Sequence, residues 1–394
     1  MSGPLSHIRV LDLSRIMAGP WCGQILADLG AEVIKVERAG AGDDTRYWGP
    51  PFLDDKDGKT TKESGYYLSV NRGKKSVELD LKSAEGQAAV RAIAAKSDIL
   101  LENFKTGTLD RMGLGYEEIA KLNPRLIYCS ITGFGLTGPK ANDAAYDFMI
   151  QGMGGLMSVT GAADESPGGG PQKVGVPIVD IMTGMYAGIG VLAALSNRGE
   201  TGKGDHIDLA MLDVSVAMLA NQAMNYLVSG NPPERRGNRH PNIQPQNVYP
   251  VSDGYIVLAV GNDDQFRRFA AVIDRVELAD DVRFSSNAGR VENLADLEAI
   301  LVEALANRTI NEWVELFAEA GVPSGPINTV DRVFEEPQIM HRKMLRKIPH
   351  PLSGTVAQVV SPLNFRNAPL TFNHSAPLLG EHTSDILAAL GLGD

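Results

Sequence analysis

The sequence has little of what a metal site or a disulfide-bonded fold requires. Its 394 residues include only two cysteines, Cys22 and Cys129, which lie too far apart in sequence to suggest a ligand cluster. The seven histidines show no H-x-x-x-H or H-E-x-x-H spacing that would place two ligands on one helix face. We therefore expect neither a metal ion nor a disulfide framework.

Positive charge and long apolar runs are also scarce. The 37 Lys and Arg residues are outnumbered by 48 Asp and Glu residues, which argues against binding to nucleic acid. No apolar run approaches the roughly 18 to 20 residues of a membrane helix, and the segment Met1 to Ile8 lacks the basic and apolar parts of a secretory signal. With 43% hydrophobic residues, the sequence predicts a globular cytoplasmic protein with no membrane partner.

Alternating strand and helix patterns dominate the first part of the chain. An apolar strand pattern over Ile8 to Leu13 is followed by a helical pattern up to Leu29 and a second strand over Glu32 to Glu37, which predicts a βαβ unit. The pattern recurs in further predicted elements: strands at 76–81, 98–101 and 126–132, and a helix at 84–95. This order is typical of a Rossmann-like, doubly wound α/β domain.

The pattern changes after residue 180. Two apolar helices are predicted at Ile181 to Leu195 and Leu209 to Leu227, and such apolar faces suggest burial against another subunit. A linker at 230–245 then leads to a strand pair and to helices at 263–273, 294–306 and 310–320, which form a smaller α+β unit. The last sixty or so residues are rich in proline and suit a tail that returns to the first domain. We predict a large domain over 1–220, a linker and small domain over 221–330, and a returning segment over 331–394.

Two nucleotide-binding motifs are only partly matched. The turn at 18–23 lacks the G-x-G-x-x-G of a dinucleotide site, and the segment 197–204 lacks the first glycine and the Ser or Thr of a P-loop. Cations are more informative, because they recur at predicted strand ends, where open α/β sheets bind ligands. They are Arg15, Arg38, Arg72, Lys74, Lys75 and Arg111. They would suit a ligand carrying phosphates, and scattered surface salt bridges are the alternative.

Asp180 stands where the first apolar helix is predicted to begin. One interpretation is an N-cap, whose carboxylate accepts backbone N–H groups of the first turn. The other is an ionised nucleophile held near the positive end of the helix dipole. The sequence has no G-x-S-x-G motif and no cysteine in a basic, His-flanked setting, so Ser and Cys nucleophiles are not indicated. Tyr146 and Asp147 precede another predicted helix. For Asp147, the roles of helix-capping acid and functional residue are equally favoured at this point.

An ordered set of motifs runs through nearly the whole chain. The motifs begin at the following stretches: Leu11-Asp-Leu-Ser-Arg15, Leu29-Gly-Ala-Glu-Val, Asn71-Arg-Gly-Lys74, Glu102-Asn-Phe-Lys105, Thr132-Gly-Phe-Gly, Asp180-x-x-Thr-Gly, Val260-Gly-Asn-Asp, Gly321-Val-Pro-Ser-Gly and Leu379-Gly-Glu-His-Thr383. In this order they resemble the class III CoA-transferases of the CaiB/BaiF type, to which formyl-CoA transferase belongs.

This resemblance implies a fold, a nucleophile and a ligand. Members have a Rossmann-like large domain and a small domain, and two chains form an interlocked-ring homodimer. The nucleophile would be Asp180, which would form an acyl anhydride and then an aspartyl-CoA thioester. Acyl-CoA and small carboxylic acids would be substrates, and no cofactor would be permanently bound. The CoA contacts implied are Arg15, Ala18, Arg38, Arg72, Lys74, Asn103, Phe104, Lys105, Arg111, Tyr146 and Asp147.

Departures from the formyl-CoA transferase pattern bear on the substrate. Met17 replaces a Gln, and Val260 to Asp264 replaces a poly-Gly loop, which argues against a formyl/oxalate pair. Arg239 and His240 lie in a stretch similar to that of members acting on dicarboxylates, although Gln246 replaces the usual Tyr. We expect dicarboxylic acids such as succinate, and we expect a loop at Gly261 and Asn262 to cover the site.

Two other functions stay open at this point. The α-methylacyl-CoA racemases share the fold and use a His and an Asp as paired acid and base. Their Gly-His-Asp motif corresponds here to Ala145-Tyr146-Asp147, so the histidine is missing. A non-catalytic scaffold that binds CoA is the third possibility, if Asp180 only caps its helix.

Overall fold

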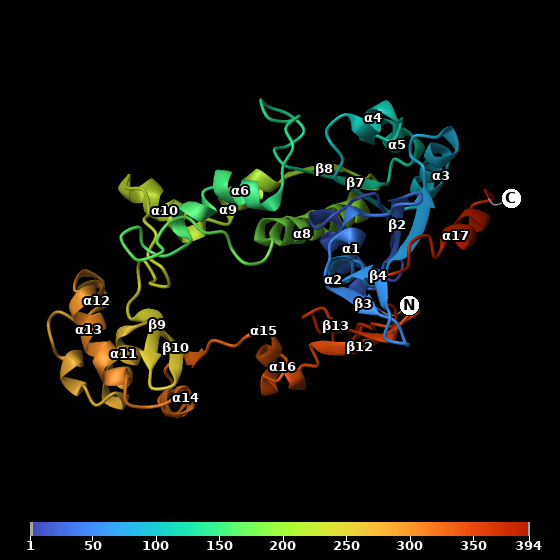
Figure 1. Cartoon of the computed structure of the whole chain (residues 1–394). Helices are drawn as coiled ribbons and strands as arrows, with labels where there is room; N and C mark the ends of the chain where they lie inside the picture. The colour runs from blue at the N-terminus through green and yellow to red at the C-terminus, as the bar shows by residue number, and fades with distance from the viewer. Residues whose placement is uncertain (1–2, 393–394) are drawn as a thin grey trace. The chain divides into compact units, whose positions relative to one another are not determined.

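The computed structural model describes residues 3–392, which form two compact units (Figure 1). Unit 1 comprises residues 3–156, 174–224 and 337–392, and unit 2 comprises residues 157–173 and 225–336. The sequence patterns had not singled out residues 157–173 as part of the second unit.

Unit 1 is built on a six-stranded parallel sheet with the strand order β5-β2-β1-β6-β7-β8. The strands are β1 (Arg9–Asp12), β2 (Glu32–Arg38), β5 (Lys75–Leu79), β6 (Ile99–Glu102), β7 (Ile127–Thr132) and β8 (His206–Ala210). The chain builds the sheet outward from β1 to β5, then returns to β6 on the other side of β1. The carboxyl ends of β1 and β6 therefore flank the switch point where such sheets bind ligands. The doubly wound α/β prediction is confirmed.

Alternating side chains of the strands fill a core on each face of the sheet. On one face Val10 packs with residues of α1 (Ala18–Asp28) and α8 (Ile178–Thr201). On the other face Leu11 packs with residues of α3 (Ala84–Ala95), α5 (Tyr116–Leu122) and α17 (Thr383–Ala389). Neighbouring residues of one strand thus face opposite layers, as period-two geometry requires. The result is a three-layer α/β/α arrangement.

The prediction of one continuous helix over Leu209 to Leu227 is wrong, because two helices and the end of a strand occupy this span. Residues His206–Ala210 pair with β7 as β8, and α9 (Met211–Ala217) follows directly. Ala220 has a φ of 43°, a left-handed conformation that separates α9 from α10 (Ala220–Ser229). A short edge strand running straight into helical residues leaves too brief a period-two signal to detect.

Helix α8 is the longest element of the described chain. Among residues 3–392 it alone is long and apolar enough to cross a membrane, a test that the core helices of globular proteins also pass. Its buried face includes Val179, Ala187 and Val191, and it packs on α1 and β7. Its other face exposes apolar side chains: Met185, Tyr186, Ile189 and Leu192.

The remaining elements of unit 1 are short. They are β3 (Phe52–Asp54) paired with β4 (Thr60–Ser64), β12 (Leu345–His350) paired with β13 (Gly354–Val359), the 3-10 helix η1 (Asp44–Tyr47), and helices α2 (Gly65–Val70), α4 (Thr108–Arg111), α6 (Asp147–Met153) and α16 (Pro337–His341). The short helix α7 (Leu156–Val159) lies at the junction of the units. The C-terminal segment is tied to β5, because His382 donates its backbone N–H to Ser76 O over 2.9 Å.

Unit 2 is a small α+β fold with its own core. Its antiparallel sheet has the order β11-β10-β9, formed by β9 (Gln246–Val251), β10 (Gly254–Ala259) and β11 (Ser324–Pro326). The helical segments are α11 (Asp263–Val272), η2 (Val276–Ala279), α12 (Asn287–Glu292), α13 (Leu294–Leu305), α14 (Ile310–Glu319) and α15 (Val330–Val333). Buried aromatic rings fill the core, and Trp313 stacks on Phe317 with centroids 5.2 Å apart.

Candidate active site

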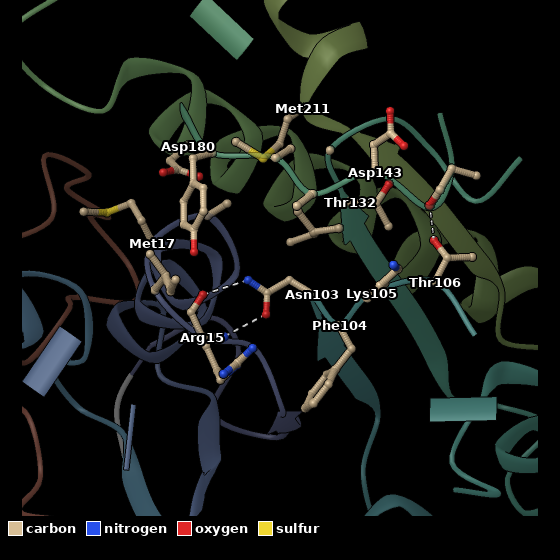
Figure 2. Close-up of a pocket in the computed structure, with 18 residues that line it drawn as sticks. Arg15, Met17, Asn103, Phe104, Lys105, Thr106, Thr132, Asp143, Asp180 and Met211 are labelled. Atoms are coloured by element: carbon tan, nitrogen blue, oxygen red, sulfur yellow. Dashed lines mark hydrogen bonds between the residues drawn. The ribbon is translucent and has the colours of Figure 1, made fainter. Parts of the chain in front are cut away.

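A cavity of about 230 Å³ opens at the carboxyl ends of the central strands, next to the switch point (Figure 2). Its walls come from the segments that follow β1, β6 and β7 and from the starts of α8 and α9. The residues lining it include Arg15, Met17, Ala18, Asn103, Phe104, Lys105, Thr106, Thr132, Asp143, Tyr146, Asp180 and Met211. Seven of the predicted site residues thus meet in one place.

Arg15 and Asn103 are joined across the switch point. Asn103 Oδ1 accepts a hydrogen bond from Arg15 N over 2.8 Å, and Asn103 Nδ2 donates to Arg15 O over 2.7 Å, as Figure 2 shows. The amide side chain therefore fixes the loop after β1 to the loop after β6. Both ends of the Asn103 amide thus hold the two loops together, and its predicted contact with CoA stays a prediction.

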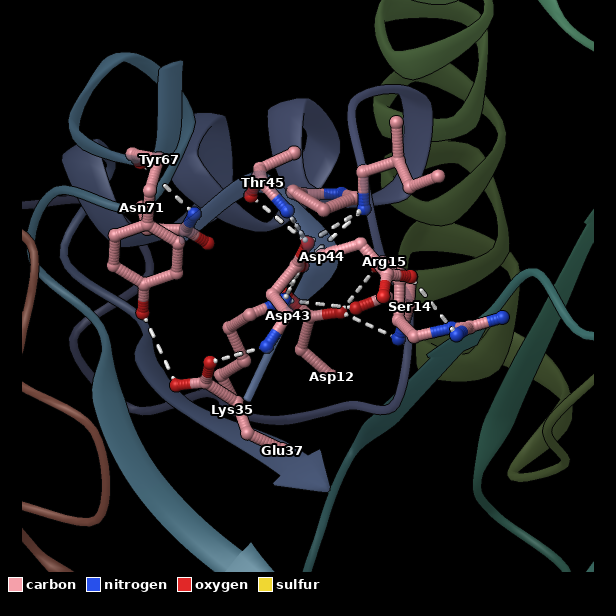
Figure 3. Close-up of polar contacts among 12 residues, drawn as sticks. Asp12, Ser14, Arg15, Lys35, Glu37, Asp43, Asp44, Thr45, Tyr67 and Asn71 are labelled. Carbon is pink, nitrogen blue, oxygen red and sulfur yellow. Dashed lines mark hydrogen bonds and ion pairs between the residues drawn. The ribbon is translucent and has the colours of Figure 1, made fainter. Parts of the chain in front are cut away.

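A buried ionic network holds the loop after β1 in place (Figure 3). Lys35 Nζ lies 2.9 Å from Asp43 Oδ2, with both side chains fully buried, and also donates to Ser14 O over 2.8 Å. Burial alone would raise the pKa of Asp43, yet the Lys35 ammonium holds it well below its usual range. The carboxylate in turn accepts the backbone N–H of Ile16, whose φ is 72°. A left-handed β-branched residue is strained, and this network holds it at the cavity wall.

Asp180 lies in the first turn of α8, but it is not the N-cap. The helix begins at Ile178, and the N-cap residue Pro177 offers no side-chain acceptor. Instead Asp147 Oδ1 accepts hydrogen bonds from Val179 N at 2.8 Å and from Asp180 N at 3.2 Å. Capping by Asp147 corrects the N-cap interpretation of Asp180 and leaves the Asp180 carboxyl free to line the cavity.

The surroundings of Asp180 make its carboxyl unusually basic. Burial is the main cause and the neighbouring Asp147 carboxylate adds to it, and together they raise the pKa of Asp180 to about 7. Desolvation and like charge both disfavour an ionised acid. Such a shift in a cavity is typical of residues that take part in chemistry.

Gly184 explains the glycine of the D-x-x-T-G motif. A Cβ at this position would lie 2.5 Å from Ala18 O and 2.9 Å from Trp21 Cβ, both on α1. Only glycine therefore lets α8 pack this closely on α1. That contact brings the first turn of α8 beside Ala18, which lines the same cavity as Asp180.

The cations predicted for CoA fall into two groups. Arg15 and Lys105 line the cavity, with the Arg15 guanidinium 5.6 Å from the centre of the Phe104 ring. Arg38 does not line it, but shares Asp44 with Arg15 at 3.7 and 3.2 Å respectively. Arg111, on α4, is exposed and bonds to Thr108 Oγ1 within its own helix.

Arg72 and Lys74 lie in buried ion pairs outside this cavity, and their contact with CoA stays a prediction. Arg72 Nη2 lies 2.6 Å from Asp28 Oδ2, and Lys74 Nζ lies 2.9 Å from Asp12 Oδ2, with both cations almost fully buried. Neither residue lines the cavity. Their charges are balanced inside the protein, because a buried ion needs a partner wherever water is excluded.

The predicted substrate residues Arg239, His240, Gly261 and Asn262 lie in unit 2. Arg239 pairs with Glu298 at 2.7 Å, and His240 Nδ1 accepts the backbone N–H groups of Asn242 and Ile243. Asn262 caps α11, and Gly261 N donates to Gln265 Oε1. Contact of these residues with substrate stays a prediction.

Some residues at the site were not among the predicted site residues. Met211, the first residue of α9, and Thr132, the last residue of β7, both line the cavity. Tyr66 is close enough to be affected by the site, since burial and then the Asp180 carboxylate raise the pKa of its hydroxyl to about 12. Strand ends pointed to Thr132 in principle, whereas Tyr66 comes from a helix with no distinguishing pattern.

The geometry agrees with comparisons to known proteins. The model of CoA-transferase family III matches residues 5–383. The chain belongs to CoA-transferase family III. It is 46% identical over 387 residues to the succinate–glutarate CoA-transferase of Agrobacterium fabrum, covering 98% of this chain and 96% of that one. It is 41% identical over 384 residues to the human succinyl-CoA:glutarate CoA-transferase, covering 98% and 85% respectively.

A solved structure has the same fold. The CaiB/BaiF family protein of Brucella suis superposes with a TM-score of 0.86 at 48% identity, covering 99% of this chain and 100% of that one. This family III member is therefore a CoA-transferase with the CaiB/BaiF fold. The resemblance inferred from the motifs is confirmed, including the departure from a formyl/oxalate-specific member.

Proposed function

We propose that the protein transfers CoA between succinate and a second small dicarboxylic acid such as glutarate, with Asp180 as the nucleophile. The observation that carries the proposal is the Asp180 carboxyl, which lines a cavity at the sheet's switch point and has a pKa near 7. The substrate class rests on relatives named for succinate and glutarate at 46% and 41% identity.

The chemistry needs only one carboxylate from the protein, and all other reacting groups come from the substrates. An Asp180 oxygen attacks the thioester carbonyl of the donor, the C–S bond breaks, and a mixed anhydride and CoA thiolate form. The thiolate attacks the aspartyl carbonyl, which releases the donor acid and leaves an aspartyl-CoA thioester. The acceptor carboxylate attacks this thioester, which breaks the C–S bond, expels the CoA thiolate and forms a second anhydride, and the thiolate then attacks the acceptor-derived carbonyl of that anhydride. The new acyl-CoA leaves and Asp180 is regenerated.

The start of α1 offers donors for the oxyanions of these steps. Its N-cap residue, Met17, makes no side-chain cap hydrogen bond, and the first turn holds no acidic residue. Ala18 of this turn lines the cavity together with Asp180. Unsatisfied backbone N–H groups at a helix start favour negative charge, so they suit a tetrahedral oxyanion or the thiolate.

The phosphates of CoA fit the positive side of the cavity. Arg15 and Lys105 would bind the diphosphate, with Arg38 and Arg111 further along the surface as candidates for the 3′-phosphate. Lys105 forms no ion pair among residues 3–392, so its charge is available. We also propose that the exposed apolar face of α8 is covered by a second copy in a homodimer.

Trapping the intermediate tests the mechanism. The protein is incubated with succinyl-CoA and a panel of carboxylates, the CoA esters are separated by mass, and Asp180 is examined for borohydride or hydroxylamine modification. Asp180→Asn should reduce transfer by at least about a thousandfold, because an amide cannot act as the nucleophile. If that variant still transferred CoA, the mechanism would be wrong. Deuterium from solvent entering the α-carbon of a branched acyl-CoA would indicate racemase chemistry instead.

A further inference from the structure

A second cavity, of about 610 Å³, lies at the amino ends of β2 and β5, the opposite edge of the sheet from Asp180. It is enclosed by Lys56 of the β3–β4 turn, by the β12–β13 turn and by the segment that precedes α17. Its basic lining residues are Lys56, Lys74, Lys75, His350, His374 and His382. Nothing in the proposed transfer reaction uses this cavity.

Two of the histidines are fixed as hydrogen-bond donors. His350 Nδ1 accepts the backbone N–H of Ser353 over 3.4 Å, and His382 Nδ1 accepts that of Ser76 over 3.3 Å. A ring nitrogen that accepts carries no hydrogen, so in each ring the proton is on Nε2. His350 is only 3% exposed, and its Nε2 is a buried atom without a partner among the described residues. Because that atom has no accessible surface, it does not face the open cavity, and of these two rings only His382 can donate to a ligand there.

The charges around the cavity favour an anion. Glu32 is already shared by two cations, since its carboxylate oxygens lie 2.6 Å from Arg9 Nε and 2.6 Å from Lys75 Nζ. Lys56 forms no ion pair in the part of the chain that the structure describes. Glu381 is the other acidic lining residue, and it accepts the backbone N–H of Leu378. Since Lys74 is balanced by Asp12, the positive groups around the cavity are Arg9, Lys56 and Lys75, against the negative Glu32 and Glu381.

We propose that this cavity binds a small oxyanion, with His382 as the N–H donor and Lys56 and Lys75 as cations. The ligand is a free carboxylate or inorganic phosphate, which share the acceptor oxygens that these groups require. The volume leaves room for a carboxylic acid of several carbons. Because the cavity lies at the amino ends of the strands, its ligand does not compete with CoA for the active site.

Calorimetric titration of the intact protein with sodium phosphate, and separately with sodium succinate, tests the proposal. One ion should bind per chain, and Lys56→Ala should weaken its binding about fivefold, the effect of losing one charge-assisted contact. His382→Phe, which keeps a ring in place, should weaken binding as well. Lys62→Ala is the matched control, because Lys62 is an exposed lysine on the adjacent β4 that does not line the cavity.

Lys105→Ala separates the two sites. If it weakens ion binding while Lys56→Ala does not, the ion occupies the CoA cavity and the second site is refuted. Absence of binding of either anion at tens of millimolar also refutes it. Binding of succinate alone would identify a carboxylate site, and binding of phosphate alone a phosphate site. None of these outcomes depends on whether Asp180 is the nucleophile.

Discussion

Asp147 caps the helix that carries Asp180, from 33 positions earlier in the chain. The Asp147 carboxylate therefore affects Asp180 in two ways. It accepts the N–H groups of Val179 and Asp180, which holds the first turn of α8 in place. Its negative charge also adds to burial in raising the pKa of Asp180. The structure of the site and the basicity of the Asp180 carboxyl are thus linked through one side chain.

The pH dependence of transfer should follow Asp180. Only the ionised carboxylate attacks a thioester, and its pKa in the free protein is about 7. We expect kcat/KM for succinyl-CoA to fall about tenfold for each pH unit below 7 and to level off above it. Stopped assays at constant ionic strength between pH 5 and 9 measure this profile. A limb near pH 4 would show that Asp180 has its ordinary acidity.

Asp147→Asn should shift that limb to lower pH. Asparagine keeps an oxygen to cap α8 but removes the negative charge, so the pKa of Asp180 should fall while burial still keeps it raised. The hydrogen bond from Gln151 Nε2 to Asp147 Oδ2 is lost in the exchange. Asp147→Ala is the comparison, because it removes charge and cap together and should also cost about 1 kcal/mol of stability. Identical pH profiles for wild type and Asp147→Asn would contradict the coupling.

Asp180→Asn should be more stable than the wild type at pH 8. The folded-state pKa lies above the unfolded value, so the carboxyl's favourable contribution is complete below about pH 4 and is lost as pH rises through 7. Replacing the ionised acid by a neutral amide should therefore stabilise the fold by roughly 1 to 3 kcal/mol at pH 8 and by much less at pH 4. Urea unfolding at the two pH values gives the difference. Equal effects at both would argue against a buried, ionised Asp180.

Gly184→Ala should impair both folding and transfer. The added Cβ would meet Ala18 O at 2.5 Å, so α8 must move away from α1 and take Asp180 with it. We expect a loss of about 1 to 3 kcal/mol and a lower kcat. Gly199→Ala on the same helix is the control, since its Cβ would meet nothing within 4 Å, and it should stabilise by about 0.5 to 1 kcal/mol. A fully active, stable Gly184→Ala variant would refute the packing role.

Lys74→Met should unfold the protein more easily without changing affinity for CoA. The substitution leaves the buried Asp12 carboxylate without its cation, which typically costs about 3 to 5 kcal/mol. Lys75→Met is the neighbouring control: its pair with Glu32 is half-exposed and should contribute under about 1 kcal/mol. Thermal unfolding and the KM for succinyl-CoA are measured together. A raised KM with unchanged stability would instead support Lys74 as a CoA contact.

The sequence predicted elements whose signal is local. The helix at Ala84–Ala95 agrees with the prediction to the residue. The strands that precede Arg15 and Asn103 were also predicted, and both end at the ligand-binding edge of the sheet. Features that depend on a distant partner were missed. No local pattern shows that Asp147 caps a helix beginning at Ile178, or that Asp12 neutralises Lys74. The sign of a charge is visible in the sequence, whereas its partner appears only when the sheet assembles.

Met17 has two separate roles, one at the cavity wall and one at the start of α1. Its side chain lines the cavity, while its role at the start of α1 involves the backbone alone, since Trp21 N donates to Met17 O and no side-chain cap is made. Met17 is only 5% exposed, so a replacement must keep its volume, whereas the start of α1 makes no demand on the side chain itself. Exchanging Met17 for a side chain of similar length, such as glutamine, therefore changes the polarity of the cavity wall while the start of α1 keeps its backbone hydrogen bond.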